Sequence, residues 1–117
     1  MNDNLFPQIP KATLKELLFW LIGKRKRFRV TGNSMLPTLQ QGDIVLLSKK
    51  FDTIQIGDII VFSHPKTNKK IIKRLQKKEG NKLFLEGDNL KESTDSREFG
   101  WIDQKDILGI AKSVINK

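Results

Sequence analysis

From residue 28 onward, short apolar runs alternate with turn-forming residues, and this pattern constrains the fold more than any other feature of the chain. The runs are rich in Val, Ile, Leu and Phe and lie at residues 28–31, 44–47, 59–62, 70–75, 83–86 and 107–115. Runs of this length and composition, bounded by turn residues, indicate β-strands. Turn-forming residues at 65–68 and 79–81 are typical of hairpins, so the strands beside them should form a meander. We therefore predict a mainly β domain built from six strands.

A single helix is predicted ahead of the strands. Apolar residues recur at helical spacing between Lys11 and Gly23, and Thr13 can cap the start. Four cations follow Gly23, where they suit the negative end of the helix dipole. The apolar stripe favours a helix that covers one side of the core. In the alternative interpretation, Phe19 and Trp20 dock with the basic cluster on a membrane interface.

The composition narrows the possible chemistry and partners. The chain has no cysteine, which excludes disulfides, thiolate metal sites and cysteine nucleophiles. Its net charge of +9, from 22 Lys and Arg against 13 Asp and Glu, suits nucleic acid, an anionic membrane or an acidic partner. The Lys-rich stretch at 70–78 lacks the interleaved aromatic residues that favour single-strand binding, which weakens the nucleic-acid interpretation. The longest apolar run, at 17–22, is six residues long, whereas a spanning helix needs about 20, so no membrane span is predicted.

The segment from Gly32 to Leu39 is suited to presenting a serine hydroxyl. Ser34 follows two small residues and precedes a short apolar arm. Pro37 should keep that arm extended, because the residue before a proline is disfavoured in the helical region. A serine hydroxyl is a weak nucleophile at neutral pH and needs a base and an oxyanion donor. If the loop is catalytic, another segment must supply the base.

Lys73 is the candidate base. Side chains alternate along a strand, so Lys73 should share a face with Ile71 and Leu75, while Arg74 points to the other face. An amine between two apolar side chains is partly desolvated, which lowers its pKa, and a neutral amine can accept a proton from serine. From this strand alone, a lysine with its stem packed and its charged end in water is the commoner arrangement. Arg74 is expected to matter less for activity than Lys73.

A polar loop follows the run at 83–86. Residues 87–97 are dense in turn formers and short polar side chains, which can supply a hydroxyl to orient an amine and an Asp/Arg pair to brace the backbone. Taken alone, this composition is typical of a plain surface loop. His64 is the only histidine and adjoins Pro65 in a turn, so we interpret it as a surface turn residue rather than as part of a catalytic triad.

Taken together, three stretches of the chain resemble the motifs of the type I signal peptidases. They are Ser34-Met35-Leu36-Pro37-Thr38-Leu39, then Lys73-Arg74, then Gly87-Asp88-Asn89 followed by Ser93, Asp95, Ser96 and Arg97. The first stretch is also similar to that of the LexA-like peptidases. His64-Pro65 and Phe99-Gly100 narrow the resemblance to the small soluble members related to the nickel-type superoxide dismutase maturation protease. The resemblance implies a small signal peptidase/LexA-like β-domain at 27–117, with an arm and an amphipathic helix at 1–26.

The resemblance also implies a role for individual residues. Ser34 would be the nucleophile, with its backbone N–H as an oxyanion donor, and Lys73 the general base. Ser93 would orient the lysine amine. The further supporting residues would be Asp88, Asn89, Asp95 and Arg97, and the substrate contacts would be Met35 and Pro37. Gly32 stands where some members carry a hydroxyl as a second oxyanion donor, so that donor lacks its usual side chain here.

We therefore expect a serine endopeptidase with a Ser/Lys dyad and no metal or other cofactor. Its substrate would be a protein precursor bound as an extended segment. The narrower resemblance implies the N-terminal extension of a nickel superoxide dismutase precursor. We expect a cytoplasmic protein without a specific nucleic-acid partner and with at most weak peripheral membrane contact. Two alternatives stay open: a reduced type I signal peptidase whose helix lies on the bilayer, and a non-enzymatic basic β-domain that binds nucleic acid.

Overall fold

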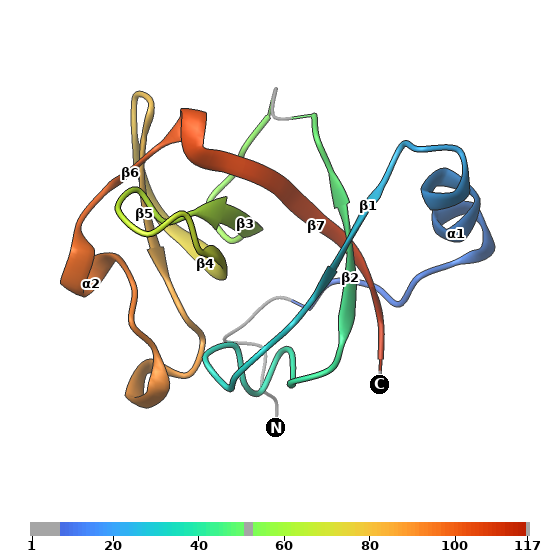
Figure 1. Ribbon diagram of the computed structural model, residues 1–117, viewed down its shortest axis with the longest axis horizontal. Helices are drawn as coiled ribbons and strands as arrows, with labels where there is room; N and C mark the ends of the chain where they lie inside the picture. Colours follow the sequence, from blue (N-terminus) through green and yellow to red (C-terminus); the bar gives the residue numbers. More distant parts are fainter. Residues whose placement is uncertain (1–7, 51–52, 117) are drawn as a thin grey trace.

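The computed structural model describes residues 8–50 and 53–116, which form a mainly β domain with one longer helix (Figure 1). The elements, in chain order, are α1 (Leu14–Leu21), β1 (Lys26–Arg29), β2 (Ile44–Ser48), β3 (Ile59–Ser63), β4 (Lys70–Glu79), β5 (Lys82–Glu86), α2 (Ser96–Phe99), β6 (Ile102–Asp103) and β7 (Ile107–Ile115), with short 3₁₀ turns at Leu90–Glu92 and Gln104–Asp106. The predicted fold class is confirmed. The six predicted strands are present, although the first lies two residues earlier than expected, and β6 is an additional strand.

The strands form one antiparallel sheet in the order β1-β2-β7-β3-β4-β5-β6. β3, β4 and β5 make the predicted meander. β7 lies between β2 and β3 and crosses the middle of the molecule, so the last strand joins the two halves of the sheet (Figure 1). The register shifts within the β2–β7, β3–β7 and β4–β5 pairs. Such bulges bend strands and increase their twist, which lets one sheet curve around its own core.

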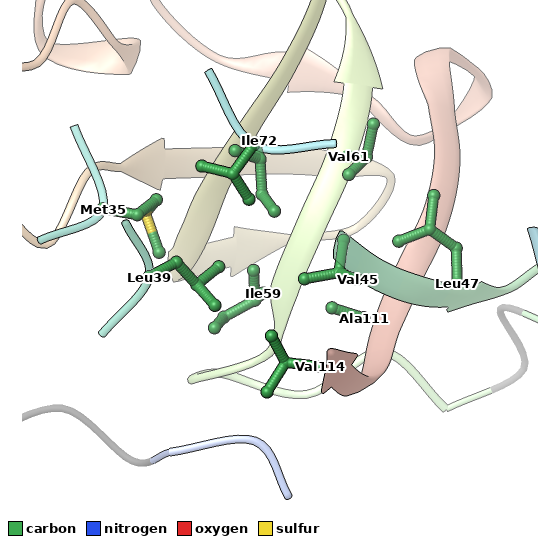
Figure 2. Packing of buried hydrophobic residues seen from close by; sticks show 10 residues of the cluster. Met35, Leu39, Val45, Leu47, Ile59, Val61, Ile72, Ala111 and Val114 are labelled. Atoms are coloured by element: carbon green, nitrogen blue, oxygen red, sulfur yellow. The ribbon is translucent and has the colours of Figure 1, made fainter. Parts of the chain in front are cut away.

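Two apolar clusters fill the domain, and β3 contributes to both. Ile59 and Val61 belong to the first cluster, and Ile60 and Phe62 to the second. Because β3 is buried on both faces, its sequence is a continuous apolar run rather than an alternating one. The first cluster also holds Val30, Met35, Leu39, Val45, Leu47, Ile72, Ala111 and Val114 (Figure 2). The second also holds Ile54, Leu75, Leu83, Leu85, Ile102, Ile107 and Ile110.

The helix α1 lies beyond β1 and β2, on the side opposite to α2 (Figure 1). The side of α1 that carries Glu16 faces the domain, because Glu16 accepts hydrogen bonds from Arg25 (3.0 Å) and from the Ser113 hydroxyl (2.8 Å). Thr13 caps the helix as predicted, accepting from the Glu16 N–H at 3.2 Å. No residue of α1 is buried. The expectation that this helix covers the core is therefore wrong.

The apolar side of α1 is exposed instead. Leu14, Leu18, Leu21 and Ile22 are 55–80% exposed and follow one another at helical spacing, so they form one stripe on the outer face. Among the described residues, no helix is long and apolar enough to cross a membrane. The first seven residues of the predicted arm lie outside the described part of the chain.

Candidate active site

Ser34 lies in the connection between β1 and β2. The residues around it form a compact turn rather than the extended arm that the sequence suggested. The Leu36 N–H donates to the Asn33 carbonyl (3.2 Å), and the Leu39 N–H donates to the Met35 carbonyl (2.9 Å). The serine is half-buried.

The two apolar residues of this turn anchor it to the core. Met35 and Leu39 are each 1% exposed and lie beside Ile59 and Ile72 in the first cluster (Figure 2). The Met35 side chain is inside the domain, so the predicted substrate contact of this residue stays a prediction for its backbone. Pro37, the other predicted substrate contact, is exposed.

Lys73 lies in β4 and is 4% exposed. Its Nζ donates a hydrogen bond to the Ser93 hydroxyl at 3.0 Å. The pKa of the Lys73 amine is lowered from its ordinary value chiefly by burial, and the nearby positive charge of Arg97 lowers it further, while the Asp95 carboxylate opposes both effects. Burial therefore shifts the amine toward its neutral form, which is the form that can accept a proton.

Asp95 holds the partner of Lys73 in place. The Ser93 hydroxyl donates to Asp95 at 2.6 Å, and the Gly87 N–H donates to the same carboxylate at 3.0 Å. Arg97 adds two side-chain hydrogen bonds to Asp95, at 2.8 and 3.0 Å. Burial alone would raise the pKa of the Asp95 carboxyl, but the hydrogen bonds from Arg97, Ser93 and the backbone lower it to about 2. Asp95 is therefore ionised at neutral pH, and it orients the Ser93 proton away from Lys73.

A second carboxylate connects the lysine strand to the serine loop. Asp88 receives two hydrogen bonds from the Arg74 guanidinium, at 2.9 and 2.8 Å, and one from the Thr38 hydroxyl. The side chains of Arg74 and Asp88 are 4% and 0% exposed. Arg74 also donates to the Gly57 carbonyl at 2.8 Å. Arg74 is expected to matter less for activity than Lys73, and the structure adds that it forms a buried ion pair that braces the site.

The loop after β5 lies directly against the serine turn. The Asn89 N–H donates to the Ser34 carbonyl at 2.9 Å, and the Asn89 side chain donates to the Asn33 carbonyl at 3.1 Å. A Cβ on Gly87 would lie 2.5 Å from the Ser34 carbonyl oxygen and 2.4 Å from the Ser93 Oγ. Only glycine leaves room for this approach of the two loops.

A pocket of about 430 Å³ is lined by both Ser34 and Lys73. His64 lines it too, although the sequence suggested only a surface turn residue. The turn is present, but the His64 ring packs edge-on against Phe99 at 4.9 Å between ring centroids, and its Nδ1 accepts from the Lys66 N–H at 3.0 Å. The His64 ring is fixed on the pocket wall by packing against Phe99, which is distant in the sequence. No local sequence signal shows such a contact.

The pocket has other walls that the sequence did not indicate. Phe28 of β1 and the hydroxyl-bearing Thr31 lie on the serine side, and Thr94 lies beside Ser93. No group of three or more His, Cys, Asp or Glu residues within 8–50 and 53–116 is arranged to hold a metal ion. The chemistry that the pocket offers is thus that of a hydroxyl, a buried amine and nearby hydrogen-bond donors.

Residues 11–112, most of the chain, match the family described as Peptidase S24-like. The chain belongs to this peptidase family. Among its curated relatives is the mitochondrial inner membrane protease subunit 1 of Mus musculus, which is 40% identical over 68% of this chain and 62% of the relative. The mitochondrial ATP-independent inner membrane protease subunit 1a of Arabidopsis thaliana is 35% identical, over 70% of this chain and 65% of the relative.

The S24-like chain is also 37% identical to the signal peptidase I of Buchnera aphidicola, over 48% of this chain and 23% of the relative. These matches support the predicted signal peptidase-like family and a peptidase. The S24-like chain spans less than two thirds of the length of these relatives.

Proposed function

We propose that this protein is a serine endopeptidase in which Lys73 activates Ser34. The observation that carries the proposal is that the half-buried serine and the buried amine line one pocket, while the amine is held by Ser93 and, through it, by Asp95. A serine needs a base to become nucleophilic, and a lysine can serve only when it is neutral. The pKa of Lys73 is lowered by burial, which shifts the amine toward that form.

The hydrogen-bond directions suggest how the base works. Ser93 gives its proton to Asp95, so its oxygen is left to accept an N–H from Lys73. With one N–H so directed, the amine can turn its lone pair toward the pocket and Ser34. As the Ser34 oxygen attacks a peptide carbonyl, Lys73 takes the serine proton and becomes an ammonium. It then gives that proton to the leaving amine, which leaves an acyl-enzyme and a neutral lysine.

Deacylation repeats these proton transfers with water. Lys73 removes a proton from the attacking water and returns one to Ser34 as the ester breaks. The backbone N–H of Ser34 is the proposed oxyanion donor in both halves of the reaction. Gly32 offers no side chain as a second donor, and the Thr31 hydroxyl, which lines the same pocket, is the candidate that the structure adds.

The substrate is proposed to bind as a strand between β1 and β4. Within the described residues, β1 pairs only with β2, and Lys70–Lys73 of β4 pair only with β3, because β5 begins its pairing at Arg74. Both strands line the pocket, through Phe28 and through residues 70–73. Unpaired strand edges bind extended peptides through backbone hydrogen bonds, which suits a protein precursor.

Three variants test this proposal on peptides derived from a whole proteome, with new N-termini read by mass spectrometry. The wild-type protein should cleave a defined set of peptides, and Ser34→Ala and Lys73→Met should cleave none of them. Lys78→Met is the matched control, since it removes an exposed lysine from the same strand and should leave cleavage unchanged. Cleavage that survives Ser34→Ala in the purified protein rules out the dyad.

The narrower proposal is that the precursor is that of a nickel superoxide dismutase and that cleavage occurs in the cytoplasm. It rests on the resemblance of His64-Pro65 and Phe99-Gly100 to the small soluble members of the family. The purified precursor, incubated with the enzyme, should lose its N-terminal extension in a Ser34-dependent reaction. An uncleaved precursor, alongside cleaved library peptides, would reject this substrate and keep the peptidase.

A second candidate is a peptidase that acts at a membrane surface. The exposed stripe of Leu14, Leu18, Leu21 and Ile22 favours it, because an apolar helix face beside cations suits an anionic bilayer. The names of the mitochondrial relatives point the same way. Flotation with anionic vesicles at physiological salt decides between the candidates: the soluble peptidase should stay at the bottom, and a membrane-bound one should float and should lose binding in Leu18→Glu.

A further inference from the structure

Two further hollows adjoin the pocket that Ser34 and Lys73 line. A neighbouring hollow of about 400 Å³ shares Phe28 and Lys70 with the pocket. A third hollow, of about 420 Å³, shares Lys26 and Lys49 with the second. These three adjoining hollows, which follow one another from the serine past β1 to the end of α1, are together called the groove.

The walls of this groove are strongly cationic. Apart from Lys73, its cations are Lys24, Arg25, Lys26, Arg27, Lys49, Lys50, Lys69 and Lys70. No Asp or Glu is among the described residues that line it. In the described part of the chain, Arg25 is the one groove cation held in an ion pair, with Glu16 at 3.0 Å. A recess lined by charges of one sign concentrates its potential and attracts ligands of the opposite sign.

We infer that this groove binds an acidic stretch of the substrate polypeptide, so that the enzyme selects precursors with clustered Asp or Glu to one side of the cleavage position. The inference rests on the proposed function and names the substrate class of that same site. A polypeptide fits better than a bilayer, because the groove is recessed and includes the nucleophile pocket, and the apolar stripe of α1 is a separate feature. Single-stranded nucleic acid favours several stacking aromatic rings, whereas Phe19, Phe28 and Phe99 are the aromatics spread over the three hollows.

The test uses quenched peptides that share the core sequence cleaved best in the proteome-derived set. Three Glu, three Gln or three Lys residues are added on the N-terminal or the C-terminal side. On one of the two sides, the Glu peptide should show a kcat/KM about tenfold above that of the Gln peptide, the order expected from a few exposed ion pairs. The difference should shrink in about 1 M salt, because salt screens exposed charges.

The double variant Lys26→Glu/Lys49→Glu should lose the preference for Glu over Gln. Its control is Lys78→Glu/Lys112→Glu, which changes the net charge equally at two exposed positions outside the groove and should keep the preference. Equal kcat/KM for Glu and Gln peptides on both sides, in a reaction that still depends on Ser34, would overturn the inference and leave the peptidase standing.

A binding measurement keeps the inference testable without turnover. Fluorescently labelled peptides should bind Ser34→Ala protein about tenfold more tightly when they carry Glu than when they carry Gln, at low salt. Equal dissociation constants for the two peptides would reject an acidic-peptide groove. The same conclusion would follow if Lys26→Glu/Lys49→Glu weakened binding only to anionic vesicles or to single-stranded DNA.

Discussion

Replacing Gly87 by alanine should disable the enzyme, because this position is where the serine turn and the loop that holds Lys73 meet. The added Cβ would lie 2.5 Å from the Ser34 carbonyl oxygen and 2.4 Å from the Ser93 Oγ. Neither neighbour can simply rotate away. The Ser34 oxygen is main-chain and accepts from the Asn89 N–H, and the Ser93 hydroxyl is held between Lys73 and Asp95.

The size of the effect follows from the distances. Ordinary contact distances are about 3.5 Å or more, so one or both loops must move by about 1 Å. A displacement of that size in a catalytic group costs about 100-fold in rate. The overpacking itself should destabilise the fold by about 1–3 kcal/mol. We therefore expect kcat/KM for the best library peptide to fall about 100-fold, with the protein still folded in a urea titration.

Gly80→Ala is the matched control. Gly80 lies at the β4–β5 hairpin with φ +59°, and a Cβ there would meet nothing within 4 Å. The alanine must adopt a left-handed conformation, which costs about 1–2 kcal/mol. This variant should lose stability and keep its activity. If Gly87→Ala retains near wild-type kcat/KM, the two loops are not held together as described and the reasoning fails.

Three further predictions concern the braces around the site. The pKa of Asp95 is about 2, against an ordinary 3.8, so its ionised form adds about 2 kcal/mol of stability above pH 4, and this contribution is lost as the pH falls toward 2. In urea titrations at pH 7 and pH 2.5, the free energy of unfolding of Asp95→Asn should change less with pH than that of wild type. Arg74→Met should cost about 3–5 kcal/mol, because it leaves the Asp88 charge buried without its partner. If Arg74→Met lost less free energy of unfolding than an exposed control such as Lys78→Met, the buried ion pair would be refuted. Met35→Ala should lower the free energy of unfolding by about 2–5 kcal/mol, and with it the urea midpoint, since the side chain is 1% exposed in the core. An unchanged midpoint with a raised KM would instead support a substrate-binding role.

The sequence predicts the β-domain well, because its strands are apolar runs bounded by turn formers. β6 escapes this reasoning, since two residues are too few to show a periodicity. β1 is displaced because its residues Lys26–Arg29 are mostly cations on the edge of the sheet, where polar side chains are tolerated. For α1, the pattern predicts the helix but not its orientation. Glu16 contacts Arg25 and the distant Ser113, and these contacts leave the stripe of Leu14, Leu18, Leu21 and Ile22 exposed.

The candidate site, like the fold, could be predicted from the sequence only in part. The motifs single out Ser34, Lys73 and Ser93, and the structure places the serine and the lysine at one pocket and joins the lysine to Ser93. The burial of Arg74 could not be read from its strand, because it depends on Asp88 arriving from the loop after β5. The wall formed by His64 likewise depends on Phe99, which comes from a distant segment.

The pH dependence of kcat/KM tests the Ser34/Lys73 proposal most directly, because two candidate bases, Lys73 and His64, line one pocket. Burial lowers the pKa of Lys73, so kcat/KM should rise with pH along a limb that lies below the ordinary lysine value of about 10.4. The limb should persist in His64→Gln, and Lys73→Arg should be inactive, since a guanidinium stays protonated. A limb that disappears in His64→Gln, with activity retained in Lys73→Arg, would contradict the account, because the histidine would then be the base.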